Sequence, residues 1–578
     1  MESIKSVYSL LSRIEKLTFL KIFILILIMT FLETFGVALV LPAVKVLISG
    51  DFYQTINIYA ESFLGKKYEK NQIIIFGLIF ISIYFVFKFL FVAFTIYNQL
   101  KFNFMILVSN CRKLYEGYLN QDYEKYTTRN PSLLVRNVSN LVDKFCGLLT
   151  DCFTILTDLT LLIGVVFFLL YVDILGTSII IMIFTTIALG YYFGTRSRFT
   201  TWGKKAVEYE YFKFKFLYEG LTGLKDIRIS QNESYFTKRY VEYVTKHGRI
   251  TFIRNFIKFL PKQTYEVIAV FGLVILSFSI IYQGKSIENF LPVAGVFAVA
   301  AFKILPSGNR LLLAFQNLRF NLAGIKILEE EIDQIQIANE EEKNNSNNST
   351  IKLENKISVK NISFQYRSRD QIVLENIDLE INKNQTIGII GKSGSGKSTL
   401  MDLIIGLYKP TSGKIFCDNT NIHLNLKAWY KNIGYVPQNI QLFDNSIKKN
   451  IAFGVNEEEI DNQRIDECLR MTKLDKWIFD LPDKLETVVG DKGIRISGGQ
   501  RQRIGIARAL YNKPKILFFD ESTSSLDLET EEKLMDEVNS MLKGITKVII
   551  SHRMSTLKDC DKIYEIKDKK ISIVKKLV

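Results

Sequence analysis

The chain has 578 residues, of which 48% are hydrophobic, 13% aromatic and 23% charged, and its net charge is +15. This length exceeds what one ordinary hydrophobic core needs and predicts several folding units. A chain this apolar is not expected to be soluble throughout, so the composition indicates one part in lipid and another in water. The six cysteines form no CxxC pair and no metal-ligand spacing with the three histidines, which favours free thiols.

Six apolar segments are predicted to cross a membrane, because a helix needs about 20 apolar residues to span the hydrocarbon core. They are residues 19–48, 72–97, 145–171, 174–193, 265–282 and 290–305. The first segment is longer than the apolar part of a signal peptide and is expected to stay as an anchor. Residues 51–64, between the first two spans, are predicted to form either an amphipathic helix on the outer surface or a solvated loop.

Long connections rich in lysine and arginine join the second span to the third and the fourth to the fifth. The positive-inside tendency places both connections, and the amino terminus, in the cytoplasm. Much of the net positive charge is therefore explained by the orientation of the chain in the membrane, and nucleic acid is not an expected partner. The helical pattern of these connections predicts that membrane helices run on into the cytoplasm and turn back near residues 123–131 and 212–225.

The residues after the last span change in character. Residues 329–350 are acidic and then asparagine-rich, with nothing to bury, and predict a linker. Residues 1–328 therefore form a predicted all-α transmembrane domain with six helices. Residues 351–578 form a predicted soluble α/β domain, in which β-rich runs precede a strand–helix alternation.

The strongest motif of the α/β domain is a glycine-rich loop between an apolar strand and a helical run. It reads Gly391-Lys392-Ser393-Gly394-Ser395-Gly396-Lys397-Ser398 and matches GxxxxGK[ST] in full. The glycines let backbone N–H groups close around phosphates at the start of a helix. Lys397 is expected to reach the β- and γ-phosphates and Ser398 to ligate Mg²⁺. ATP and Mg²⁺ are the expected cofactors.

A second motif supplies two carboxylates at the end of an apolar strand. The strand at residues 516–519 is followed by Asp520 and Glu521. A carboxylate in this place can hold Mg²⁺ through water, and the next one can polarise an attacking water. Asp520 is therefore the predicted metal residue and Glu521 the predicted general base.

Between these two motifs stands Ser497-Gly498-Gly499-Gln500, which resembles the signature of ATP-binding cassette (ABC) proteins. The resemblance implies a nucleotide contact for these four residues, together with Gly391, Ser393, Gly394, Ser395, Gly396, Lys397, Ser398 and Thr399. It also implies that Tyr366 stacks on adenine, that Gln438 senses Mg²⁺ and the membrane domain, that Asp527 is the D-loop aspartate and that His552 contacts the γ-phosphate. Residues 489–493 resemble the segment by which exporters touch the partner's membrane helices.

Six spans followed by one cassette resemble the half-transporter layout of type IV ABC exporters. In that family the signature of one cassette completes the ATP site of another, so the resemblance implies a homodimer, most simply with two-fold symmetry. It implies ATP hydrolysis coupled to alternating access of a central cavity. A cassette ATPase acting in translation or DNA repair would not carry the six spans.

Four cations in or beside the predicted spans point to the cargo: Lys88, Lys262, Lys303 and Arg310. A cation at the bilayer centre costs about 2.5–3.5 kcal/mol on insertion scales, so such residues usually face a cavity and have a partner. Because nearby carboxylates are few, the set predicts a cavity for an anionic group. The alternatives are internal pairs, Lys262 with Glu266 or Lys88 with Glu33, and a Lys262 side chain that reaches the membrane interface.

Several short motifs resemble the bacterial lipid-linked oligosaccharide flippases of protein N-glycosylation: residues 31–35, 39–42, 305–310 and 433–440. The four cations resemble the basic cavity positions of that family, with lysine for arginine at three of them, which keeps the charge but lacks bidentate geometry. The resemblance implies outward flipping of a polyprenyl-pyrophosphate oligosaccharide across the bacterial inner membrane, with membrane lipid around the protein. Export of other lipids, or of amphipathic drugs, is the alternative.

Overall fold

The computed structural model describes residues 10–48, 54–55, 57–58, 61–62, 65, 67–282, 287–345, 350–368, 370–490, 496–521, 536–537, 540–542 and 544–574. The chain divides into two compact units. Unit 1 comprises residues 1–120 and 129–337, and unit 2 comprises residues 121–128 and 338–578.

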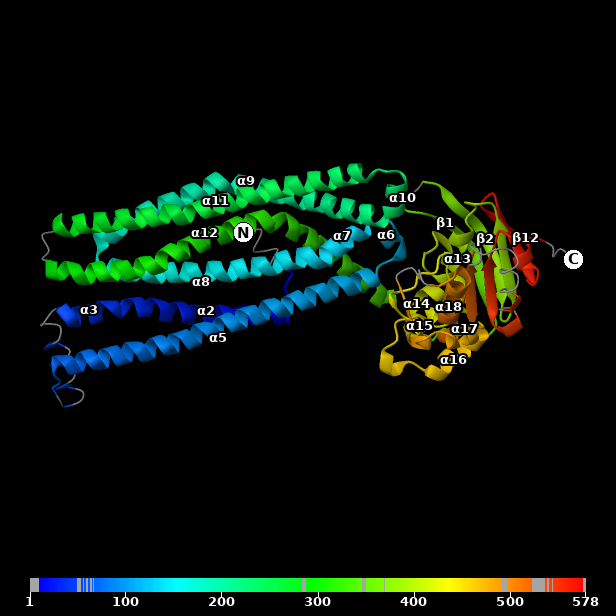
Figure 1. The fold of residues 1–578 in the computed structure, drawn as a ribbon, viewed down its shortest axis with the longest axis horizontal. Helices are drawn as coiled ribbons and strands as arrows, with labels where there is room; N and C mark the ends of the chain where they lie inside the picture. Colours follow the sequence, from blue (N-terminus) through cyan, green and yellow to red (C-terminus); the bar gives the residue numbers. More distant parts are fainter. Residues whose placement is uncertain are drawn as a thin grey trace. The chain divides into compact units, whose positions relative to one another are not determined.

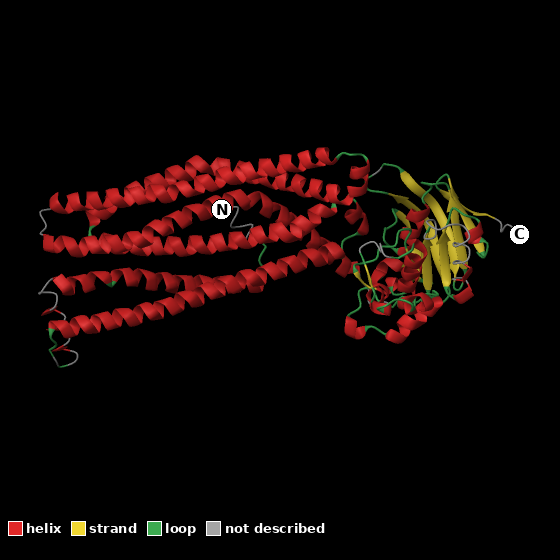
Figure 2. Ribbon diagram, in the orientation of Figure 1, coloured by secondary structure: helices red, strands yellow, loops and turns green. Residues whose placement is uncertain are grey.

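Unit 1 consists of helices, several of them very long (Figures 1 and 2). They are α2 (Arg13–Ala38), α3 (Val40–Ile48), α5 (Lys70–Leu119), α7 (Pro131–Arg136), the π-helical turn η1 (Asn137–Leu141), α8 (Val142–Val172), α9 (Ile174–Thr222), α10 (Leu224–Ile229), α11 (Glu233–Tyr282) and α12 (Ile287–Asn345). The start of α2 follows from local sequence, because Ser12 and Glu15 form a reciprocal capping box.

Five helical stretches of the described residues are long and apolar enough to cross a membrane: Arg13–Val46, Lys70–Leu119, Pro131–Val172, Ile174–Thr222 and Gly295–Ala338. They coincide with five of the six predicted spans. The sixth, residues 265–282, lies in α11, where several side chains are outside the described residues. Large apolar side chains such as Phe80, Phe89 and Phe167 are exposed on the surface of the unit. Such faces are expected of helices that contact lipid.

The interior of unit 1 is packed from interdigitating aliphatic and aromatic side chains. Ile106, Leu114, Phe145 and Leu148 are fully buried in one cluster that joins α5, α8 and α12. At Gly203 in α9, a Cβ atom would lie only 2.0 Å from the carbonyl oxygen of Phe320 in α12. The glycine therefore permits the close approach of these two helices.

The first predicted turn between long helices is confirmed, and the second lies further along the chain. A turn at residues 120–130 separates α5 from α7. The second was predicted at residues 212–225, but α9 continues to Thr222 and the chain turns at residues 223–232 around the short α10. Aromatic packing explains the difference, because Phe212 and Phe216 stack on Tyr243 of α11 with centroid distances of 4.7 and 5.6 Å.

The predicted linker is largely helical. Residues 329–350 were expected to connect the domains with nothing to bury, yet α12 continues to Asn345. Ile332 is buried in the same cluster as Leu328, which gives the start of this segment a packed face. Of residues 51–64, only 54–55, 57–58 and 61–62 are described, all helical, so the predicted amphipathic helix lies mostly outside the described residues.

The described residues of unit 2 form three sheets, whose strands are drawn in yellow in Figure 2. A four-stranded antiparallel sheet has the order β2 (Ile372–Asn382), β1 (Lys356–Gln365), β4 (Ser412–Cys417), β5 (Thr420–Asn421). A six-stranded sheet has the order β12 (Lys570–Val574), β11 (Lys562–Lys567), β3 (Thr386–Gly391), β10 (Thr546–Ile550), β9 (Ile516–Asp520), β6 (Ile433–Val436). All of its pairs except β11–β12 are parallel. β7 (Asn445–Ser446) pairs with β8 (Val488–Val489).

The helices of unit 2 are short. They are α6 (Tyr123–Thr127), α13 (Lys397–Ile405), α14 (Leu426–Tyr430), α15 (Ile447–Ile451), α16 (Asn462–Met471), α17 (Asp475–Phe479) and α18 (Gly498–Tyr511), with the 3₁₀ turns η2 (Ile422–Leu424), η3 (Glu457–Glu459), η4 (Lys484–Glu486) and η6 (Ser555–Leu557). Strand β9, which lies between β10 and β6, is buried on both faces: Phe518 belongs to one hydrophobic cluster, and Leu517 and Phe519 to another. This explains why residues 516–519 are continuously apolar.

Candidate nucleotide-binding site

The glycine-rich loop joins strand β3 to helix α13 in unit 2, as its sequence predicted. Gly394 and Gly396 have φ values of +79° and +102°, a region that side chains disfavour. A Cβ atom at Gly396 would also lie 3.0 Å from Cδ2 of Leu374. These two glycines therefore let the backbone turn tightly into α13, whose amino terminus favours anions.

Lys397, the first residue of α13, is held inside this loop. Its ammonium group donates to the carbonyl oxygens of Gly391 at 3.1 Å and Lys392 at 3.2 Å. The side chain is only 5% exposed, and this burial lowers the pKa of Lys397. Ser395 Oγ in the same loop is buried and has no hydrogen-bond partner among the residues that the structure describes. A buried cation next to an unsatisfied hydroxyl fits a phosphate group.

Two oxygen-bearing side chains that could bind a metal lie together where Mg²⁺ was predicted. Ser398 Oγ donates to Asp520 Oδ1 at 3.2 Å, and burial raises the pKa of Asp520. Tyr435 Oη, from β6, donates to the other carboxylate oxygen of Asp520 at 3.5 Å. Among the described residues, no group of three or more His, Cys, Asp or Glu side chains forms a metal site. A hydroxyl and one carboxylate fit Mg²⁺, which usually completes its coordination with water and substrate phosphates.

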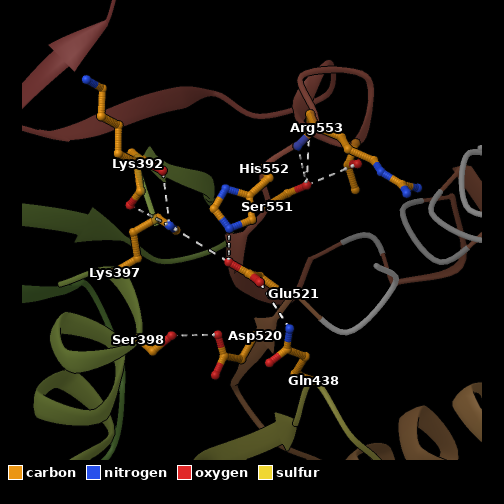
Figure 3. A network of polar contacts seen from close by, with 11 residues as sticks. Lys392, Lys397, Ser398, Gln438, Asp520, Glu521, Ser551, His552 and Arg553 are labelled. Atoms are coloured by element: carbon orange, nitrogen blue, oxygen red, sulfur yellow. Dashed lines mark hydrogen bonds and ion pairs between the residues drawn. The ribbon is translucent and has the colours of Figure 1, made fainter. Parts of the chain in front are cut away.

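Glu521 is the meeting point of the predicted catalytic residues (Figure 3). Its Oε1 lies 2.6 Å from His552 Nε2 and 3.8 Å from Lys397 Nζ. Its Oε2 accepts a hydrogen bond from Gln438 Nε2 at 3.2 Å. The backbone of Glu521 has a φ of +46°, a strained conformation for a residue with a side chain, and such strain often marks a functional position. The carboxylate is therefore tightly placed by its neighbours.

The predicted adenine-stacking residue is also positioned next to α13. Tyr366 follows β1, and its hydroxyl forms a 2.9 Å hydrogen bond with Thr399 Oγ1. Its ring meets the rings of Phe364 and Tyr408 edge-on, with centroids 4.9 and 5.5 Å away. These contacts fix the ring beside the helix that carries Lys397.

The signature residues Ser497, Gly498, Gly499 and Gln500 begin α18, another element of unit 2. Ser497 caps this helix and forms a reciprocal capping box with Gln500. α18 packs mainly against α15, α16 and β6, whereas α13 packs mainly against β3 and β9. Asp527, and residues 491–493 of the segment at 489–493, lie outside the described residues.

Sequence reasoning missed two residues near this site, Tyr435 and Glu124. Tyr435 stands three positions before Gln438, so its strand placed it within reach of Asp520. Glu124 belongs to α6, the short helix in the turn between α5 and α7, which is part of unit 2. Its Oε1 accepts from the backbone N–H of Arg367 at 2.6 Å, next to Tyr366. Beside it, the rings of Tyr123 and Tyr408 lie 5.7 Å apart.

The predicted cavity cations of unit 1 have carboxylate partners, with one exception. Glu33 Oε2 lies 3.4 Å from Lys88 Nζ and 2.6 Å from Lys303 Nζ. The Lys88–Glu33 pair was one of the alternatives drawn from the sequence. Arg310 is bound by both carboxylate oxygens of Asp158, at 2.9 and 2.5 Å. Lys262 is exposed and forms no ion pair within the described residues, Glu266 included.

Comparison with known proteins agrees with this description. Residues 374–524 match the model of the ABC transporter family, and residues 19–298 match that of the ABC transporter transmembrane region. A solved structure of a bacterial Atm1-family ABC exporter with ATP bound superimposes with a TM-score of 0.71 over 94% of each chain, at 20% identity. The fold and the two matches together identify the architecture of this chain as that of an ABC exporter half-transporter, with the type IV exporter fold.

Curated relatives match over a shorter stretch. A protein of Rickettsia typhi, provisionally named an export ATP-binding/permease protein, is 39% identical over 242 residues, which are 42% of this chain and 41% of that protein. A leukotoxin translocation ATP-binding protein of a Pasteurella haemolytica-like species is 41% identical over 212 residues, 36% of this chain and 30% of that one. The chain thus spans less than half the length of these relatives in the matched region.

Proposed function

We propose that two copies of this chain form an ATP-driven exporter, in which ATP is bound and hydrolysed between the cassettes. The observation that carries this proposal is the convergence on Glu521 of Lys397, Gln438 and His552, with Ser398 and Asp520 beside them. The names of the curated relatives refer to export and translocation, and they support export as the direction of transport.

The residues of the site suit phosphoryl transfer to water. Lys397 holds the β- and γ-phosphates, and Ser398 and Asp520 hold Mg²⁺, which supplies charge neutralisation when bound. Glu521 accepts a proton from the attacking water, and Gln438 and His552 orient Glu521 and the terminal phosphate. The signature residues Ser497 to Gln500 of the partner close the site, because their helix α18 packs apart from α13 in their own chain.

We propose further that the cargo is an anionic lipid, most simply a polyprenyl-pyrophosphate oligosaccharide moved outward across the bacterial inner membrane. Lys88, Lys262, Lys303 and Arg310 supply four positive charges, and the carboxylates bound to them, Glu33 and Asp158, supply only two negative ones. The remaining charge supports recognition of phosphate groups. The cytoplasmic turns carry the motion of the cassettes to the membrane helices.

Export of a neutral lipid or an amphipathic drug is the second candidate. One observation favours it: Arg310 is already bound through both oxygens of Asp158, so this cation has little capacity left for a substrate anion. In that case removal of the lysines would leave transport intact.

The test is flipping of a fluorescent polyprenyl-pyrophosphate oligosaccharide by the full-length protein in liposomes. Lys303→Ala and Lys88→Ala should each reduce ATP-dependent flipping by about tenfold or more, while Lys101→Ala, an exposed lysine of α5, should not. Unchanged flipping in both cavity variants would remove the pyrophosphate argument and leave the second candidate. Absence of ATP-dependent flipping in the wild type would contradict the proposed cargo.

A further inference from the structure

Glu33 lies at the centre of a three-residue cluster in unit 1, Lys88–Glu33–Lys303, contributed by α2, α5 and α12. One oxygen of the carboxylate, Oε2, contacts both ammonium groups, at 3.4 Å from Lys88 and 2.6 Å from Lys303. Two positive charges thus share one negative charge. The cluster keeps a net charge of about +1 when its members are ionised.

The two lysines of this cluster are held very differently. Lys88 is built into the structure: its side chain is 10% exposed, and its ammonium group lies 4.4 Å from the centre of the Phe85 ring. Gly36, one turn after Glu33 in α2, lies against it: a Cβ atom there would stand 3.7 Å from Lys88 Nζ, an ordinary van der Waals distance. Lys88 therefore serves to fix Glu33.

Lys303 is the accessible member of the cluster. Its side chain is 40% exposed, whereas that of Glu33 is 14% exposed. Lys303 stands one turn before Ser307 and two turns before Arg310 on α12, and the Ser307 hydroxyl accepts a 3.0 Å hydrogen bond from Arg310. An anion that approaches this face of α12 meets Lys303 first and meets Glu33 as a competitor for it.

We infer that Glu33 is a resident counter-ion that occupies the substrate-binding cation Lys303 in the absence of cargo and is displaced from it by the cargo's phosphate groups. This rests on the proposed function, because it assumes an anionic lipid cargo. During displacement Glu33 keeps Lys88 as its partner, so no buried charge is left alone, which would be costly. The counter-ion lowers affinity for the phosphate and so favours release of the cargo on the far side.

The experiment compares variants of the full-length protein in phosphatidylcholine nanodiscs. The measured quantity is the concentration of polyprenyl pyrophosphate that gives the half-maximal change in ATPase rate. In Glu33→Gln the competitor is removed, and this concentration should fall by about fivefold or more, the lower end of typical coupling between linked binding events. The double variant Glu33→Gln/Lys88→Met restores the net charge of the wild-type cluster and should keep part of this fall, because Lys303 stays free of its competitor while the charge of Lys88 is lost.

The outcomes separate this inference from the proposed function. A wild type that does not respond to polyprenyl pyrophosphate overturns the cargo proposal and the inference with it. A wild type that responds while the concentration stays equal or rises in the charge-balanced double variant overturns the inference alone, and assigns Glu33 a structural role. Adding Lys303→Gln to the double variant should abolish the gain.

Two further probes identify the source of the phosphate. Free pyrophosphate and uncharged polyprenol are tested in the same nanodiscs, and neither should reproduce the response to polyprenyl pyrophosphate. An equal response to free pyrophosphate overturns recognition of a lipid headgroup and assigns Lys303 to soluble phosphates. An equal response to polyprenol overturns phosphate recognition.

Discussion

His552 Nε2 lies 2.6 Å from Glu521 Oε1, and these two residues follow the carboxyl ends of the neighbouring parallel strands β10 and β9. The same carboxylate also faces Lys397 and Gln438. In the chain as described, the proposed general base is therefore engaged by the groups that are proposed to bind the phosphate. Binding of ATP would have to exchange these internal contacts for contacts with the nucleotide and the attacking water.

Replacing Glu521 by glutamine should abolish hydrolysis while ATP binding persists. The amide keeps the contact to Gln438 but cannot take a proton from water, so the ATPase rate should fall by about 100-fold or more. ATP-bound dimers should accumulate and be visible by size-exclusion chromatography with radiolabelled ATP. Glu458→Gln, at an exposed position of η3, is the matched control. Normal turnover by Glu521→Gln would overturn the assignment of the base.

Lys397→Ala should weaken ATP binding and not only slow catalysis. The ammonium group is the buried cation of the glycine-rich loop, and its loss should weaken ATP affinity by about tenfold or more in equilibrium binding. Lys392→Ala is the control, because the Lys392 side chain is exposed and only its carbonyl oxygen contacts Lys397. Equal affinities for the two variants would contradict the role of Lys397.

Tyr435→Phe should alter the dependence of ATPase activity on Mg²⁺. The variant loses the hydroxyl that donates to Asp520 Oδ2, so the carboxylate is less well oriented for the metal. The Mg²⁺ concentration for half-maximal activity should rise by about threefold to tenfold. Tyr430→Phe, whose hydroxyl donates to the carbonyl oxygen of Gly406, should keep the wild-type value. A shift of equal size in both variants would point to general destabilisation.

Glu124→Gln should weaken the link between α6 and the cassette segment that carries Tyr366. The carboxylate binds the backbone N–H of Arg367 at 2.6 Å and lies 3.5 Å from its guanidinium Nε. We expect the KM for ATP to rise about threefold and transport per ATP hydrolysed to fall, since charged hydrogen bonds contribute about 1.5–3 kcal/mol. Glu116→Gln, an exposed residue of α5, is the control. Unaltered coupling would contradict this role.

Asp402, on α13, should make stability depend on pH. Burial raises its pKa from 3.8 to about 7. Because the folded carboxyl holds its proton more tightly than the unfolded one, its contribution to stability is complete below about pH 4 and is lost as the pH rises through about 7. The thermal midpoint of Asp402→Asn, measured relative to that of the wild type, should therefore rise between about pH 5.5 and pH 8. A difference that stays constant over this pH range would contradict this.

The sequence predicted those parts of the fold that local patterns determine. The strand–loop–helix around Lys397 and the apolar strand before Asp520 are found as expected, because each is specified by a contiguous motif. The turn predicted near residues 212–225 lies later in the chain, because Phe212 and Phe216 pack on Tyr243 and belong to α9. Tyr243 is about thirty residues further on, and no local sequence signal reports that contact. The helical continuation of α12 was missed for the same reason, since Ile332 is buried by distant residues.

The sequence predicted which residues belong to the site better than it predicted the contacts between them. Lys397, Asp520 and Glu521 follow from motifs, but the engagement of Tyr435 and Glu124 depends on how elements pack. The pairing of Arg310 with Asp158 joins positions 152 residues apart and could not be read from spacing. Glu33 was recognised only as one partner of Lys88, whereas its shorter contact is with Lys303.

The central claim is that each ATP is held between Lys397 of one chain and Ser497 of the other. Mixed dimers in the Glu521→Gln background test it, with ATP occluded per dimer as the measurement. When one chain carries Lys397→Ala and the other Ser497→Arg, both changes fall in one site, and one ATP should be occluded. When a single chain carries both changes, each site is damaged and none should be occluded. Equal occlusion in the two arrangements would contradict the account.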